Sequence, residues 1–175
     1  MNISIRRARQ NEFATVRKFY HVLTDEMRDS EFYIGCQKDI YPTPEFLSKS
    51  IADGELFIGE LDGEIAACMV LNHEYNDGYK KIRWSVEVDD EKLLVIHALG
   101  VRPKFSGRGV GKLMTRFALD FARRKNFKTM RLDVLDGNTP AEKLYTAEGF
   151  RFVDELKMFY EDTGWTTYKL YEILF

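Results

Sequence analysis

The stretch V-R-P-K-F-S-G-R-G-V-G-K-L, residues 101–113, decides how the rest of the chain is interpreted. Gly107, Gly109 and Gly111 stand at alternate positions in it, after an apolar run and before an amphipathic segment that begins at Val110. Glycine permits positive φ angles and close approach of a ligand. The free N–H groups and positive dipole end of a helix start attract an anion. The sequence therefore predicts a strand-to-helix turn that binds phosphate.

Two other kinds of phosphate loop fit this spelling less well. A Walker A loop would need glycine where Ser106 stands and a hydroxyl residue where Leu113 stands. The dinucleotide motif G-x-G-x-x-G would need glycine in place of Lys112. Both departures disfavour a nucleoside triphosphatase and a dinucleotide-binding domain.

The turn resembles the acetyl-CoA signature of the GNAT superfamily of N-acetyltransferases, Q/R-x-x-G-x-G/A, which follows a strand ending in valine. Serine replaces the first Gln/Arg here. In that family the loop's backbone amides hold the pyrophosphate, and the main chain of the preceding strand pairs with pantetheine. The resemblance implies that acetyl-CoA is bound by Leu99, Gly100, Val101, Ser106, Gly107, Arg108, Gly109, Val110, Gly111 and Lys112.

Three basic side chains near the loop could also meet the phosphates of coenzyme A. They are Lys104, Arg108 and Lys112, and a charge-assisted contact with phosphate would suit each of them. The alternative of a solvated surface charge stays open, most of all for Lys104. A second basic cluster, residues 6–9, has no such context and is interpreted as the surface of an edge strand.

A second motif, D-G-N-T-P-A-E-K-L-Y-T-A-E-G-F at residues 136–150, matches the GNAT pattern N-x-x-A-x-x-L-Y-x-x-x-G-F. The resemblance implies that Tyr145 reprotonates the departing CoA thiolate and that Asn138 contacts the cofactor. Phenol and thiol pKa values of about 10 and about 8.5 suit this transfer. Alternatively, Tyr145 is an aromatic core residue, and Asn138 is a turn residue before a short helix capped by Thr139.

The proton acceptor has two candidates. His97 lies four residues before Val101, hence on the same strand face if no bulge intervenes, and an imidazole pKa of about 6.5 suits a base near neutral pH. Asp133 stands where GNAT enzymes that modify ribosomal-protein N-termini carry an acidic acceptor. A hydrogen-bonded structural role for His97, and deprotonation through ordered water, remain open alternatives.

Composition narrows the class of partner. The 175 residues include 26 Lys and Arg against 28 Asp and Glu, a formal charge of −2, which disfavours nucleic acid and anionic membranes as partners. Cys36 and Cys68 have neither metal-ligand spacing nor nearby histidines, so we expect two reduced cysteines and no metal cofactor. Neither a signal peptide nor an apolar run of membrane-spanning length occurs. We expect a cytoplasmic protein with one domain, residues 1–175.

The periodicity of the chain predicts an element order of β, α, α, β, β, β, α, β, α, β, β. A helix is expected from a cap at Asn11, an Asp-Gly hairpin at residues 62–63, and an antiparallel pair around residues 162–164. The alternating stretch at residues 82–88 is interpreted as a small extra hairpin at the substrate mouth. The order resembles the GNAT acyl-CoA N-acyltransferase fold. This is an α/β (α+β) arrangement, with about four helices around a mixed sheet that splays after its fourth strand.

These features together predict an acetyl-CoA-dependent N-acetyltransferase that acts on a primary amine in a ternary complex. No cysteine stands in a nucleophile context. The long connection at residues 28–43 is rich in apolar residues, which suggests a small amine or a peptide N-terminus as acceptor, although packing as a lid is equally compatible. These residues are Phe32, Tyr33, Ile34, Ile40 and Tyr41. A non-catalytic acyl-CoA-binding or partner-docking module is the alternative, and homodimers are common in the superfamily.

Overall fold

The computed structural model describes residues 3–32 and 34–175, and within them one seven-stranded sheet has the order β1-β2-β3-β4-β5-β7-β6. Only β4 and β5 pair in parallel, so the sheet is mixed as predicted. The strands are β1 Ser4–Arg7, β2 Leu56–Leu61, β3 Glu64–Asn72, β4 Leu93–Val101, β5 Thr129–Leu135, β6 Arg151–Tyr160 and β7 Gly164–Leu174.

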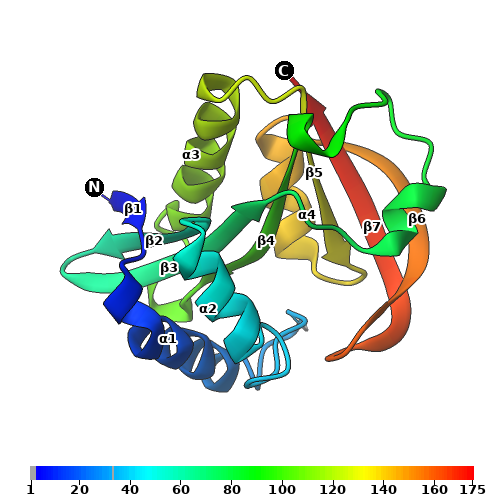
Figure 1. Ribbon diagram of the computed structural model, residues 1–175. Helices are drawn as coiled ribbons and strands as arrows, with labels where there is room; N and C mark the ends of the chain where they lie inside the picture. The colour runs from blue at the N-terminus through cyan, green and yellow to red at the C-terminus, as the bar shows by residue number, and fades with distance from the viewer. Residues whose placement is uncertain (1–2, 33) are drawn as a thin grey trace.

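Helices cover both faces of this sheet (Figure 1). The described residues form four α-helices: α1 Phe13–Glu26, α2 Pro44–Ala52, α3 Val110–Arg124 and α4 Thr139–Ala147. One apolar cluster joins α1 and α2 to the sheet, and a separate cluster joins α3 and α4 to the opposite face. The predicted stripe of α3 is buried at Val110, Met114, Ala118 and Ala122. The GNAT fold expected from the sequence is confirmed.

Strands β4 and β5 are joined by a short ladder and then separate. The three paired positions run from Leu93 opposite Thr129 to Val95 opposite Arg131. Beyond them the two strands diverge, as Figure 1 shows. Residues 96–101 therefore keep one edge that has no strand partner among the described residues, and this is the splay predicted after the fourth strand.

A β-bulge interrupts β4 halfway along its length. Between Cys68 and Val70, β3 advances two residues while β4 advances three. Ala98 lies in the bulge with a φ of 49°, a value that a residue with a Cβ seldom adopts. The Tyr20 hydroxyl of α1 donates a 2.8 Å hydrogen bond to the Ala98 carbonyl. Helix α1 thus stabilises the bend in the strand.

The bulge overturns one sequence-based expectation. In a regular strand, His97 and Val101 would lie on the same face, but the extra residue places them on opposite faces. The His97 ring lies edge-on to Phe46 of α2, with centroids 6.1 Å apart. Val101 instead packs against the cluster under α3.

Gly100 permits α1 to approach the bulged strand. A Cβ at this position would lie 2.4 Å from Cδ2 of Leu23 in α1. A side chain at this position would require the buried Leu23 side chain to move. The glycine is therefore favoured by packing as well as by its place beside the predicted loop.

The segment at residues 82–88 forms no strand, so the prediction of an extra hairpin is wrong. It is held by the side chains of two buried residues, Arg131 of β5 and Glu172 of β7. The guanidinium of Arg131 donates to the Val86 carbonyl at 2.6 Å and lies 4.2 Å from the Trp84 ring centroid. The Glu172 carboxylate accepts a hydrogen bond from the Ser85 amide at 2.9 Å. These contacts take the place of a strand ladder.

Two helix starts also differ from prediction. Asn11 lies inside a 3₁₀ turn, Gln10–Glu12, that precedes α1. The cap of α4 is Asn138 and not Thr139, because the Asn138 side chain accepts the hydrogen bond from the Ala141 amide. In both places the true helix boundary is shifted by one or two residues.

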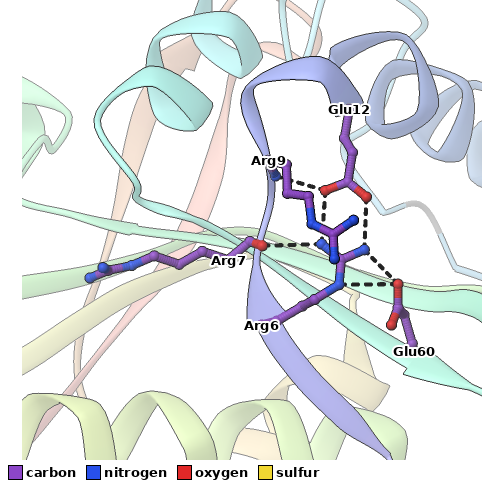
Figure 2. A network of polar contacts seen from close by, with 5 residues as sticks. All are labelled: Arg6, Arg7, Arg9, Glu12 and Glu60. Carbon is purple, nitrogen blue, oxygen red and sulfur yellow. Dashed lines mark hydrogen bonds and ion pairs between the residues drawn. The ribbon is translucent and has the colours of Figure 1, made fainter.

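The N-terminal strand is attached to the fold by a charge network (Figure 2). The Arg6 guanidinium binds both carboxylate oxygens of Glu12, at 2.7 and 2.8 Å, and also binds Glu60 at 2.6 Å. The Glu12 carboxylate accepts a further hydrogen bond from the Arg9 amide at 2.7 Å. Arg6 is therefore a partly buried connector of β1, β2 and α1, and not the edge surface expected from the sequence.

We predict that Glu12→Gln lowers the free energy of unfolding by about 1.5–3 kcal/mol, a range typical of hydrogen bonds to charged groups. The hydrogen bonds from Arg6 lower the pKa of Glu12 from 4.5 to about 2. Because the folded pKa is the lower one, this stabilisation is complete above pH 4.5 and is lost as the pH falls toward 2.

Urea unfolding at a series of pH values measures this difference between the parent protein and Glu12→Gln. Glu87→Gln is the matched control, because Glu87 is exposed and makes no ion pair among the described residues. Equal stability losses in the two variants at pH 7 would contradict the predicted role of the network.

Candidate active site

A cavity of about 870 Å³ lies at the splay between β4 and β5. Its walls come from β4, the glycine loop and the start of α3 on one side. The end of α1, the connection before α2, the end of β5, the start of α4 and the strands β6 and β7 near their turn also contribute. Every element on which the sequence placed a site residue therefore contributes to one cavity.

The glycine loop has the geometry expected of an anion site. Gly107 and Gly109 both have a φ of 72°, and a Cβ at either would meet no atom within 4 Å. Gly109 immediately precedes α3, so the first amides of that helix lack an intrahelical acceptor. The predicted acetyl-CoA-binding residues that line the cavity are Leu99, Gly100, Val101, Ser106, Gly107, Gly109, Val110, Gly111, Lys112, Asn138 and Tyr145.

The basic side chains around the loop are placed differently. Arg108 does not line the cavity, because its guanidinium pairs with Asp62 at 2.8 Å. Lys104 also lies outside the cavity and pairs with Glu64. Lys112 does line the cavity and lies 3.7 Å from the Glu148 carboxylate. Of the three, only Lys112 is positioned toward a ligand in the cavity.

Tyr145 lies on α4 and faces the cavity from a buried position. Its ring packs edge-on against Phe150, with centroids 5.5 Å apart. The structure gives its hydroxyl no hydrogen-bond partner among the described residues, so the group is available to a ligand. Burial raises the pKa of Tyr145, and the nearby Asp133 carboxylate raises it further. The hydroxyl therefore keeps its proton until a strong acceptor appears.

Asp133 lies on β5, at the bottom of the splay, and lines the same cavity. The hydroxyls of Tyr79 and Tyr160 both donate to its Oδ2 atom, at 2.8 and 2.9 Å. No described residue donates to Oδ1. Burial raises the pKa of Asp133, while the two phenol hydrogen bonds act in the opposite direction. One oxygen is thus held by the protein and the other is left for a ligand.

His97 also lines the cavity, on the α2 side of β4. Its Nε2 atom lies 2.9 Å from the Glu74 carbonyl, so this nitrogen must carry a proton and donate it. Burial lowers the pKa of His97 to about 4. The ring is consequently neutral near pH 7, and only Nδ1 can accept a proton.

Several residues that line the cavity or bind its side chains have no distinguishing pattern in the sequence. Tyr79 and Tyr160 are distant from Asp133 in sequence, and only the fold brings their hydroxyls to one oxygen. Asp162 was interpreted as part of a turn, yet it is buried and lines the cavity. The apolar composition of residues 28–43 was a usable signal, because Phe32, Ile34 and Tyr41 do line the cavity.

Not every apolar residue expected to matter in the connection at residues 28–43 lines the cavity. Ile40 does not line the cavity and is exposed, and Tyr33 lies outside the described residues. Cys36 lines the cavity, and burial raises the pKa of its thiol to about 12. Cys68 is buried in the core as predicted.

No group of three or more His, Cys, Asp or Glu side chains among the described residues could hold a metal ion. None of the helices in this part of the chain is both long and apolar enough to span a bilayer.

Comparison with known proteins identifies the family. The model of the acetyltransferase (GNAT) family matches residues 17–150. Over 75 residues the chain is 35% identical to the N-alpha-acetyltransferase RimI of Mycobacterium tuberculosis, a match that covers 43% of this chain and 46% of RimI.

Solved structures agree on the fold. A GNAT-family acetyltransferase from Streptococcus agalactiae superposes with a TM-score of 0.77 at 18% identity, covering 99% of this chain and 95% of that one. An acetyltransferase from Salmonella typhimurium, solved with its cofactor acetyl-CoA, gives a TM-score of 0.68 at 16% identity, covering 99% and 94%. The chain belongs to the GNAT family of acetyltransferases, which transfer acetyl groups from acetyl-CoA.

Proposed function

We propose that this protein transfers the acetyl group of acetyl-CoA to a primary amine, by direct attack of the amine within a ternary complex. One observation carries the proposal. A phosphate-type loop, a tyrosine with an available hydroxyl and a partly buried carboxylate line the same cavity, although they come from three separate parts of the chain. Amine acetylation needs these three kinds of group to hold the thioester, protonate the thiolate and accept the amine proton.

The residues of the cavity fit acetyl-CoA as a substrate. The free edge of β4 at Leu99 and Val101 offers main-chain groups to the amide groups of pantetheine. The loop at Gly107 and Gly109 leaves open space beside its amides for the pyrophosphate. Lys112 supplies a positive charge at the same end.

Opposite pKa shifts support Asp133 as the proton acceptor in preference to His97. Burial disfavours the charged form of any group, so it raises a carboxyl pKa and lowers an imidazole pKa. It makes Asp133 a stronger base than an ordinary carboxylate and makes His97 a weaker base than an ordinary histidine. His97 then serves as a neutral wall of the acceptor site.

The chemical step can be written with these groups. An amine that arrives as ammonium gives one proton to Asp133, and its nitrogen forms a bond to the thioester carbonyl carbon. The carbon–sulfur bond breaks, and Tyr145 donates its proton to the departing thiolate. A second proton leaves the nitrogen as the amide forms. It replaces the proton that Tyr145 donated, so the tyrosine hydroxyl is restored. The net products are the acetamide, free coenzyme A and one proton.

The state of Cys36 supports direct transfer. This thiol lines the cavity, but with a pKa raised to about 12 it stays protonated at neutral pH. A thiolate is the form of cysteine that attacks a thioester. An acetyl-cysteine intermediate at this position is therefore disfavoured.

Two measurements on the purified protein test the proposed function. Calorimetry measures acetyl-CoA binding, and release of free thiol from acetyl-CoA is followed across a panel of primary amines. Binding together with amine-dependent thiol release is the expected result. Tight binding with no amine-dependent release would instead indicate an acyl-CoA-binding module, and absence of binding would remove the proposal altogether.

We predict that Tyr145→Phe lowers kcat by about 10²–10⁴-fold, the range for loss of a general acid. Acetyl-CoA affinity should stay near that of the parent protein, because the ring contact with Phe150 is retained. Tyr75→Phe is the matched control, because the Tyr75 hydroxyl binds Asp90 outside the cavity. An unchanged kcat in Tyr145→Phe would remove the role proposed for its hydroxyl.

We predict that the acid limb of the kcat/KM profile belongs to Asp133. The pKa of Asp133 is raised above the ordinary Asp pKa of about 3.9. Activity should therefore begin to fall at a higher pH than it would with an ordinary aspartate as the base. Asp133→Asn should abolish most activity at every pH. His97→Gln should keep the acid limb of the parent protein, and loss of that limb in His97→Gln alone would transfer the base role to His97.

A further inference from the structure

Two carboxylates on the acceptor side of the cavity, one buried and one partly buried, have no cationic partner among the described residues. Asp133 and Asp162 both line the cavity, and neither forms an ion pair in the part of the chain that the structure describes. Burial raises the pKa of both groups. The hydrogen bonds from Tyr79 and Tyr160 to Asp133, and from the backbone amides of Asp162 and Thr163 to Asp162, act in the opposite direction. Buried charges in proteins are normally paired with an opposite charge. Neither carboxylate has such a partner among the described residues, so the site favours a ligand that brings positive charge.

Aromatic rings line the cavity together with these carboxylates. The Tyr160 ring lies 4.9 Å from that of Tyr168 and 6.5 Å from that of Tyr41, centroid to centroid. All three residues line the cavity. The faces of such rings attract ammonium groups, so this wall favours the same sign of charge as the carboxylates do.

A substrate carboxylate would have no partner here. Lys112 is the one Lys or Arg side chain that lines the cavity among the described residues, and it lies on α3 beside the glycine loop. His97 is neutral because burial lowers its pKa to about 4. An acidic group on the acceptor would therefore be desolvated beside Asp133 and Asp162 without compensation.

The connection before α2 also packs on the acceptor side of the cavity at Gly35 and Gln37. The Gln37 side chain donates to the Asp162 carbonyl at 2.5 Å. A Cβ at Gly35 would lie 3.6 Å from Oδ2 of Asp162, so the connection packs directly on the β6–β7 turn. This contact holds Asp162 in place beside the connection and limits the space next to its carboxylate.

We propose that the acceptor is a small dicationic amine, a diamine or polyamine with no carboxylate on the carbon that bears an amino group. The proposal rests on the proposed function and adds the class of acceptor to it. The reacting ammonium binds Oδ1 of Asp133, the atom that Tyr79 and Tyr160 leave free. The second cationic group lies against the tyrosine rings and the Asp162 carboxylate. The first group then donates its proton to Asp133 and attacks the thioester as described above.

The proposal is tested with a diamine and two related amines. Each of the two differs from the diamine by one charged group. Pentane-1,5-diamine carries two ammonium groups, pentylamine lacks the second, and lysine adds a carboxylate to the diamine. We expect kcat/KM for the diamine to exceed that for pentylamine by about tenfold to a hundredfold, since a partly buried charged contact contributes about 1.5–3 kcal/mol. Lysine should be a poorer substrate than the diamine by at least about tenfold, because either orientation places its carboxylate among acidic groups.

A variant separates charge recognition from other effects. In the parent protein, kcat/KM for the diamine should exceed kcat/KM for pentylamine. Asp162→Asn should bring the ratio of these two values close to one, mainly by raising the KM for the diamine. Asp154→Asn is the matched control, because Asp154 lies exposed on β6 outside the cavity. It should leave the ratio as in the parent protein.

The outcomes distinguish this proposal from the proposed function. Equal kcat/KM values for the diamine, pentylamine and lysine would overturn the dicationic class and leave N-acetylation standing. So would a higher kcat/KM for the N-terminus of a peptide amide than for the diamine. Acetyl-CoA binding without thiol release for any amine would overturn both proposals together.

Discussion

The structure depends on the early end of the ladder between β4 and β5. Pairing stops at Val95, and the remaining edge of β4 has no strand partner among the described residues. Unpaired backbone groups need hydrogen bonds from water or from a ligand. The bulge at Ala98, held by the hydroxyl of Tyr20, turns the strand as it leaves its neighbour. The cavity, its binding edge and its two separate sides all follow from this one divergence.

Burial in that cavity sets the chemistry of each titratable group in a different way. The same loss of solvent raises the pKa of Tyr145 and of Asp133 and lowers the pKa of His97. An acid that holds its proton, a carboxylate of increased basicity and a neutral ring therefore arise from one physical cause. Hydrogen bonds then refine the result, as when Tyr79 and Tyr160 occupy one oxygen of Asp133.

Local sequence patterns predicted the parts whose determinants are local. The glycine spacing before Val110 and the apolar stripe after it specify a loop and a helix within one stretch of chain. The segment at residues 82–88 was mispredicted, because alternation alone favours a strand. Its conformation is decided by Arg131 and Glu172, which lie more than 40 residues away in sequence. The place of His97 was missed for a related reason, since the bulge depends on contacts with α1.

By itself, the sequence determined the order of the elements, the phosphate-type loop and the family motif that contains Tyr145. Each of these is encoded by residues within about one turn or one strand of each other, where periodicity and glycine spacing act directly. Only the tertiary structure decided that Asp133 is held by two tyrosines, that His97 is neutral, and that no cation among the described residues lies beside Asp162. These properties depend on burial and on contacts between distant strands. A local sequence pattern shows neither of them, because both arise only when the chain folds.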